Sequence, residues 1–335
     1  MIDGFVLLVP LLLLPILILF RFIGCGGEPF TSGDPRPAPY EDQVTEDPAI
    51  VAYWRLGEPA PPAPPDPPAQ AKDEVNSNHG DYVETPANQP ATELSQGGLS
   101  GKAVRGAPNS SLLRSEPSRT SVDFEGGYVR VPNFAAAMQT LTTFGVEAWV
   151  LAQGWESGTA TAPFAHTVVL MAELDAGPPA VPPRGFSLFA QWVDGSIASD
   201  PLPPGNTAGF YWRASVGNGT EFARVTVWDK QAVLNRKTYL AVTYDANKNT
   251  DQLRLHVGMG ASDAGAWDAF VTTGYVPAQQ NRLYIGVGNA MMPPTESIYG
   301  PFVGFIQDVA VYSRSLGSEG DLERVATNLE LAFGP

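Results

Sequence analysis

Short runs in which apolar and polar residues alternate recur along most of this chain. The clearest covers 302–312 and passes into a short polar tail. Such alternation is typical of half-buried strands, and the runs are rich in Val, Phe, Tyr and Trp, with Gly, Pro, Asn and Asp clusters between them. The runs are 122–131, 144–151, 185–193, 208–216, 222–228, 238–244, 252–257, 282–287 and 302–312. The pattern predicts an all-β sandwich of two antiparallel sheets.

One helix is predicted after residue 48, from Ser318 to about Leu331. Ser318 is a suitable N-cap, because its side chain can accept a hydrogen bond from the first turn. The apolar residues at roughly helical spacing are Leu322, Val325, Ala326, Leu329 and Leu331. A short C-terminal helix therefore follows the last predicted strand.

The last strand also carries a motif. Residues 302–316 read Phe-x-Gly-x-Ile-Gln-Asp-Val-x-Val-Tyr-x-Arg-x-Leu, which resembles the closing strand of laminin-G-like, concanavalin A-type β-sandwich domains. Further segments resemble that family in the expected order: 51–58, 121–124, 128–132, 144–150, 238–245, 253–258 and 283–288. The resemblance covers the chain from about residue 48 onward. It implies a two-sheet antiparallel jelly-roll fold and no particular activity.

The N-terminus is apolar from Phe5 to Phe20 and has no charge within that run. Sixteen residues rise about 24 Å as a helix, short of the roughly 30 Å hydrocarbon core. Adding Phe22 and its neighbours, with Arg21 reaching toward the interface, gives the usual length. Residues 1–25 are therefore predicted to form a single transmembrane anchor.

Two alternatives for this segment stay open. A cleaved signal peptide lacks support, because no basic residue precedes the apolar run and no small-x-small site follows it. A lipoprotein signal fits in part, since 22–25 resembles the bacterial lipobox and would place an acyl group on Cys25. With the anchor as the main interpretation, we expect the sandwich on the periplasmic or outer face of a bacterial inner membrane.

The predicted organisation has three parts. The anchor is followed by a Pro- and Gly-rich linker at 26–47 and by the β-sandwich domain at 48–335. A proline-rich run at 58–70 looks like a second linker, but 72–82 resembles a segment within the family domain. The run is therefore predicted to be a loop inside the sandwich.

The net charge of the chain excludes one class of partner. The formal net charge is −15 and the pI about 4.5, without a basic patch, so nucleic acid is an unsuitable partner. Cys25 is the single cysteine, so no disulfide can form within the chain and sheet packing must stabilise the domain.

Many glycosidases share this sandwich fold, so the sequence can be searched for their catalytic carboxylates. A retaining enzyme needs two carboxylates on one strand face, spaced as Glu-x-Asp-x-Glu or nearly so. Glu173 and Asp175 begin such a motif, but Gly177 and Pro178 stand where the second Glu must fall. No catalytic residue and no cofactor are therefore predicted, and the chain is expected not to be an enzyme.

Calcium is a weaker prediction that follows from the resemblance, because relatives often bind it at one rim of the sandwich. Oxygen ligands are available in Asp73, Asn76, Asn78, Asp81 and Asp308. Gln307 replaces an aspartate that is usual in the family, which removes one charged ligand.

Exposed aromatic residues beside polar ones are candidates for ligand contact. Trp155 and Trp267 lie in loop-like contexts, and Tyr211 lies on a strand that leads to Asn218. Four other tryptophans, Trp149, Trp192, Trp212 and Trp228, alternate with small residues on strands, where burial is the usual use of Trp. Trp192 is also followed closely by an aspartate, Asp194.

Two functions follow from these observations. The first is a non-catalytic, membrane-tethered accessory subunit whose sandwich docks on a larger respiratory, photosynthetic or secretion assembly, with other membrane subunits as partners. The alternative is a membrane-anchored carbohydrate-binding or adhesion module with glycans as partners. A glycoside hydrolase is the least favoured, since only half of its motif is present.

Overall fold

The two eight-stranded antiparallel sheets of the sandwich combine hairpins of consecutive strands with pairs of strands that are distant in sequence. A computed structural model describes residues 40–56, 70–84, 104–107, 121–123, 127–132, 134, 138, 140–155, 165–173, 184–198, 200–259, 266–270, 274–278, 282–289, 298–299, 302–317 and 321. Residues 39–335 belong to one compact unit. The predicted all-β, two-sheet antiparallel sandwich is confirmed.

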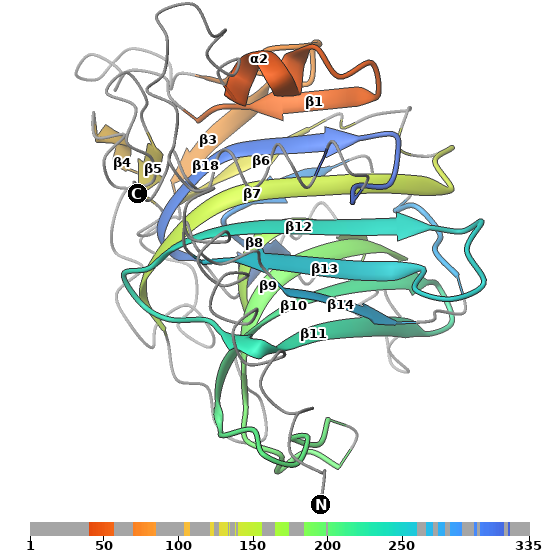
Figure 1. The fold of residues 1–335 in the computed structure, drawn as a ribbon. Helices are drawn as coiled ribbons and strands as arrows, with labels where there is room; N and C mark the ends of the chain where they lie inside the picture. The colour runs from red at the N-terminus through yellow and green to blue at the C-terminus, as the bar shows by residue number, and fades with distance from the viewer. Residues whose placement is uncertain are drawn as a thin grey trace, which may run out of the picture. The chain divides into compact units, whose positions relative to one another are not determined.

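The first sheet has β7 and β18 at its centre. Its strands, in spatial order, are β14 (Ala266–Phe270), β13 (Leu253–Gly258), β12 (Lys237–Asp245), β7 (Thr143–Gly154), β18 (Val303–Tyr312), β5 (Ser121–Asp123) and β4 (Val104–Ala107). The opening strand, β1 (Ile50–Trp54), also pairs with β18. The last long strand of the chain is therefore the partner of the first (Figure 1).

The second sheet carries the long hairpins of the middle of the chain. Its order is β11 (Phe222–Gln231), β10 (Gly209–Asn218), β9 (Arg184–Val193), β8 (Ala165–Glu173), β15 (Leu283–Ile285), β6 (Gly127–Val131), β3 (Gly80–Glu84) and β2 (Gln70–Ala71). A separate pair joins β16 (Gly288–Asn289) to β17 (Ile298–Tyr299). In Figure 1 the strands β10 and β11 of this sheet run below β13.

Alternation decides which side chains meet between the sheets. Along β7, Phe144, Val146 and Ala148 belong to the main core, whereas Glu147 and Trp149 point to the opposite face. Each fully buried Val, Leu, Ile or Phe contributes about 1.5–3 kcal/mol relative to exposure, so a core of this kind stabilises the sandwich without disulfides. The outer face of the first sheet nevertheless holds a second buried cluster, which the alternation alone would have left in water.

The predicted runs correspond to strands, and the run 122–131 covers two of them, β5 and β6. Several elements were not predicted, among them β4, β8, β14, β17 and the helix α2 (Tyr40–Thr45). Of the predicted C-terminal helix only Asp321 is described, so that prediction lies otherwise outside the described residues.

Helix α2 lies within the segment predicted as a linker. Tyr40 and Val44, one turn apart, are buried against the first sheet, and Figure 1 shows the helix above β1. The Thr45 hydroxyl donates to the Glu41 carbonyl oxygen at 2.8 Å, closing the last turn. Part of the predicted linker thus packs on the sandwich, while the predicted domain boundaries themselves stay a prediction.

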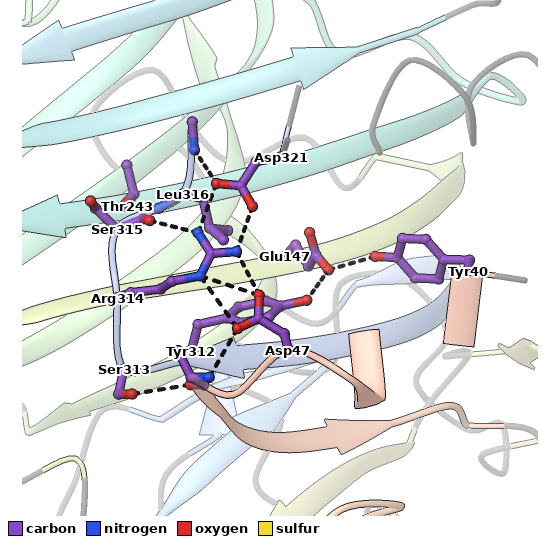
Figure 2. A network of polar contacts seen from close by, with 12 residues as sticks. Tyr40, Asp47, Glu147, Thr243, Tyr312, Ser313, Arg314, Ser315, Leu316 and Asp321 are labelled. Atoms are coloured by element: carbon purple, nitrogen blue, oxygen red, sulfur yellow. Dashed lines mark hydrogen bonds and ion pairs between the residues drawn. The ribbon is translucent and has the colours of Figure 1, made fainter. Parts of the chain in front are cut away.

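Glu147 is the centre of the outer cluster. Its Oε1 accepts hydrogen bonds from the Tyr40 hydroxyl at 2.7 Å and the Tyr312 hydroxyl at 2.5 Å, and its Oε2 accepts one from Tyr239. The Trp149 ring meets the Tyr40 and Tyr239 rings edge-on, with centroids 6.3 and 5.1 Å away. Figure 2 shows Tyr40 and Tyr312 converging on this carboxyl group. One side chain thereby joins α2, β7, β12 and β18.

A second contact fastens the start of the domain to its last strand. The Arg314 guanidinium bonds to Asp47 at 2.6 Å and to Asp321 at 2.5 and 2.7 Å (Figure 2). Hydrogen bonding to Asp321 raises the pKa of Arg314 most, and Asp47 adds to the effect. The Ser313 backbone N–H also donates to the Ala49 carbonyl oxygen at 2.8 Å. The segment before β1 is therefore held by the segment after β18.

The predicted localisation of the chain, anchored in a membrane by one helix, is wrong. Within the described ranges, no helix has the length and apolar character needed to cross a bilayer. The helix α2 has 6 residues, and six residues rise only about 9 Å against a core of roughly 30 Å. The predicted anchor, with Phe5, Phe20, Arg21 and Phe22, and the predicted acylation site Cys25 lie outside the described residues.

Replacing Glu147 tests whether its carboxyl group organises the outer cluster. We expect Glu147→Ala to lower the free energy of unfolding by about 3–5 kcal/mol, because three buried hydroxyls lose their shared acceptor. Tyr40→Phe removes a single bond and should cost about 1–2 kcal/mol. Urea unfolding followed by circular dichroism measures both. Equal unfolding midpoints for Glu147→Ala and the unchanged chain would contradict this role.

Candidate functional site

Five aromatic rings gather where β7 and β9 end and where β8 and β10 begin. Trp155 stacks on Phe210 with centroids 4.8 Å apart and planes at 19°. Trp192 and Phe210 form a T-shaped pair at 5.5 Å and 68°, and His166 and Phe210 form another at 5.5 Å and 63°. Trp212 meets Trp155 at 6.0 Å and 75°. The rings therefore form one connected cluster with Phe210 at its centre.

Strand register explains why these rings meet. Phe210 pairs with Trp192 across β10 and β9, and Trp212 pairs with Ala190, which also pairs with His166 on β8. Residues two apart on a strand share a face, and Trp212 and Ala190 belong to the main core. The cluster thus continues the core toward the surface at one end of the sandwich.

Exposure rises along the cluster. His166 and Trp212 are fully buried, Trp155 and Phe210 are half-buried, and Trp192 is 37% exposed. The exposed ring thus packs on the half-buried Phe210 ring, which in turn contacts the buried His166 ring. An aromatic face held in this way needs little reorganisation to bind a ligand.

The loop between β11 and β12 lies at the same end of the sandwich as the aromatic cluster. The Ala232 N–H donates to the Phe210 carbonyl oxygen at 2.8 Å, and the Asn235 N–H donates to that of Ala152 at 2.7 Å. Between these anchors Val233 and Leu234 are 44% and 38% exposed. We refer to Trp155, Trp192, Phe210, Val233 and Leu234 together as the aromatic end.

Polar groups border Trp192. The Ser196 N–H donates to the Asp194 carboxylate at 2.8 Å. Hydrogen bonds from the Ser196 side chain and backbone, followed by one from the Trp192 side chain, lower the pKa of Asp194. An ionised acceptor therefore stands next to the exposed ring.

The predicted contact residues do not converge. Trp155 belongs to the aromatic end, but Tyr211 lies on the opposite face of β10, where its hydroxyl donates to the Thr207 carbonyl oxygen at 2.6 Å. Asn218 lies at the far end of β10, and its Oδ1 accepts from the Thr220 and Glu221 N–H groups at 2.8 Å each. Trp267 is on strand β14 rather than in a loop, and its side chain is not among those described.

Trp192 is the residue that sequence reasoning placed in the core. Along β9 it lies on the same face as the core residues Phe186, Leu188 and Ala190, which is why burial was expected. The strand ends one residue later, however, and the other sheet does not cover it fully. The available signal was the Asp194–Gly195 pair that directly follows the strand.

The predicted calcium ligands are engaged with the protein itself. Buried Asp73 accepts from the N–H groups of Tyr53, Val75 and Asn78 at 3.0–3.1 Å. Asn76 and Asn78 donate to Val51, Asp81 pairs with Arg130 at 3.8 Å, and Asp308 accepts from the Tyr53 hydroxyl. No group of three or more His, Cys, Asp or Glu side chains within the described part could hold a metal ion. Calcium remains a prediction from the resemblance.

Comparison with known proteins gives structural likeness alone. No protein-family model matches the sequence, and no curated protein sequence matches it either. Among solved structures, the chain is similar to domain 4 of AbnA, a GH43 extracellular arabinanase from Geobacillus stearothermophilus, in complex with arabinotriose. The identity is 10%, the coverage 84% of this chain and 98% of that one, and the TM-score 0.45.

Two further solved structures have similarly low sequence identities and TM-scores. A botulinum neurotoxin type C structure, described as dependent on two ganglioside molecules for cell entry, shares 9% identity over 86% of this chain with a TM-score of 0.47. The match covers 53% of that chain, so the similarity spans about half of the toxin structure's length. CBM40 of the Ruminococcus gnavus IT-sialidase, bound to α2,3 sialyllactose, shares 11% over 56% of this chain and 85% of that one, with a TM-score of 0.38. Because these TM-scores lie below 0.5, the function of this chain has to be inferred from its own residues.

Two tryptophan variants test whether Trp192 is free to serve a ligand. Trp212→Ala should lower the free energy of unfolding by about 3–5 kcal/mol, because it empties a fully buried site. Trp192→Ala should cost about 1 kcal/mol, since its ring already lies partly in water. Urea unfolding of both variants gives the comparison. A cost for Trp192→Ala as large as that for Trp212→Ala would show that the ring is a core element.

Proposed function

We propose that the chain is a non-catalytic carbohydrate-binding module whose aromatic end receives a sugar ring. The observation that carries this proposal is Trp192, which is 37% exposed, packs on Phe210 at 5.5 Å and lies two residues before the carboxylate of Asp194. The C–H face of a sugar stacks on an aromatic ring, and its hydroxyls donate to carboxylates. Both partners are in place and already ordered.

The chemistry favours a sugar over a protein partner at this position. A stable protein interface takes roughly 800 Å² from each partner, with a central aromatic anchor and a broad surround. The aromatic end offers three exposed side chains, Trp192, Val233 and Leu234, with an ionised carboxylate at its border. That is the scale of one or two sugar rings, with one stacking ring and a polar acceptor.

The accessory-subunit function predicted from the sequence is not retained. It depended on a membrane anchor that would place the sandwich among other membrane subunits. Among the helices that the structure describes, none could serve as that anchor. The glycan-binding alternative needs only the sandwich and the residues at its end.

A glycan array probed with the full chain identifies the sugar, and titration by intrinsic fluorescence then gives its affinity. We expect Trp192→Ala to weaken binding by roughly thirtyfold or more, as for a central aromatic anchor. Trp192→Phe should retain part of the affinity because a stacking face remains.

The matched control is Val276→Ala. Val276 is 36% exposed, and its backbone bonds to Gly185 and Gly217, so it lies toward the opposite end of β9 and β10 from Phe210. Its loss should leave binding at the aromatic end unchanged. Equal weakening by both variants, or no glycan bound on the array, would exclude the proposed site.

A further inference from the structure

The outer face of β9, β10 and β11 carries a buried ion pair that the aromatic end does not use. Arg213 is fully buried, and its Nη1 and Nη2 bond to the two carboxylate oxygens of Asp200 at 2.6 and 2.7 Å. Nη1 also donates to Gln191 Oε1 at 2.8 Å. Arg213 alternates along β10 with Trp212 and Ala214, which face the main core. The ion pair therefore lies on the opposite face of the sheet.

A second arginine shares the same carboxylate. Arg224 Nη1 lies 3.2 Å from Asp200 Oδ2, and the Arg224 side chain is 27% exposed. Its guanidinium carbon lies 5.1 Å from the centroid of Phe222, a ring that is 51% exposed. Arg224 also pairs across the strands with Ser215, whose hydroxyl lies 2.7 Å from that of Ser187. The exposed part of Arg224 thus borders an aromatic face and two hydroxyls.

The positive charge in this cluster exceeds the negative charge. Two guanidinium groups meet the single carboxylate of Asp200. Within the part of the chain that the structure describes, the Nε atoms of Arg213 and Arg224 are both buried without a hydrogen-bond acceptor. Burial, and next the charge of Arg213, lower the pKa of Arg224 to about 10 against the opposing effect of Asp200. A bound anion would relieve this imbalance.

We propose that Arg224, with Arg213 behind it, forms an anion-binding site for the carboxylate of an acidic sugar. Planar guanidinium groups match carboxylates, the Phe222 ring offers a face for stacking, and Ser187 and Ser215 offer hydroxyls to a hydroxyl-rich ligand. The net charge of −15 opposes the approach of long polyanions, which favours a short ligand or the end of a chain. This site goes beyond the proposed function, since it needs neither Trp192 nor the aromatic end.

Titration of the full chain with a short oligogalacturonate, and with the same oligomer methyl-esterified, tests the site by calorimetry. The acid should bind and the uncharged ester should not. Arg224→Gln should weaken binding about ten- to hundredfold, the range for a lost hydrogen bond to a charged group. Arg224→Lys should keep part of the affinity, because the charge remains while the planar fork is lost.

Asp200→Asn should produce a change of opposite sign. It keeps acceptor and donor atoms near Arg213 but removes the competing negative charge, so the acid should bind more tightly. Trp192→Ala should leave this binding unchanged, which separates failure here from failure at the aromatic end. Thermal unfolding confirms that each variant is folded.

Several results would overturn the inference. They are equal binding of acid and ester, unchanged binding by Arg224→Gln, and weaker binding by a folded Asp200→Asn variant. Inorganic sulfate, added as a competitor, distinguishes the sources of the anion. Displacement of the oligogalacturonate by sulfate at millimolar concentration supports an anion site at the arginines, and sulfate binding without any binding of the oligomer contradicts a sugar site.

Discussion

The shared carboxyl group of Glu147 is the interaction on which the outer layer of the first sheet depends. Three tyrosine hydroxyls, from α2, β12 and β18, reach this one side chain on β7. A buried carboxyl group without such donors would cost several kcal/mol, and buried tyrosines need acceptors in turn. The hydrogen bonds thus offset the cost of burying both the carboxyl group and the tyrosine hydroxyls. Because Tyr40 is one of them, the same group also fixes helix α2 on the sheet.

Strand positions could be predicted because alternation is a local property of the sequence. The predicted runs at 144–151 and 238–244 lie within β7 and β12 of the structure. Glu147, by contrast, looks like an ordinary outward-facing polar residue in a strand, and nothing local indicates that tyrosines about a hundred residues away will cover it. Helix α2 was missed for the same reason, since its stability comes from packing of Tyr40 and Val44 and not from its own short sequence.

The candidate site was predictable only in part. Trp155 was expected in a contact position, but Trp192 was expected in the core because its strand parity matches that of buried residues. Exposure of a strand-end residue depends on how far the opposite sheet extends. It also depends on the Ala232–Asn235 turn, which is far from Trp192 in sequence and is bound to Phe210 and Ala152 by backbone hydrogen bonds. Contacts between segments this far apart in sequence cannot be recognised from the periodicity of apolar residues.

The central place of β18 has a consequence for the order of assembly during synthesis. The strand lies between β7 on one side and β5 and β1 on the other, although it is the last long strand to leave the ribosome. Until it is made, β1 and β7 lack the neighbour that joins them, and Tyr312 cannot reach Glu147. Pairings this distant in sequence form slowly and leave strand edges uncovered in the meantime. A growing chain would therefore expose both edges from the time β7 is made until β18 follows, which makes this interval the one in which a chaperone would matter most.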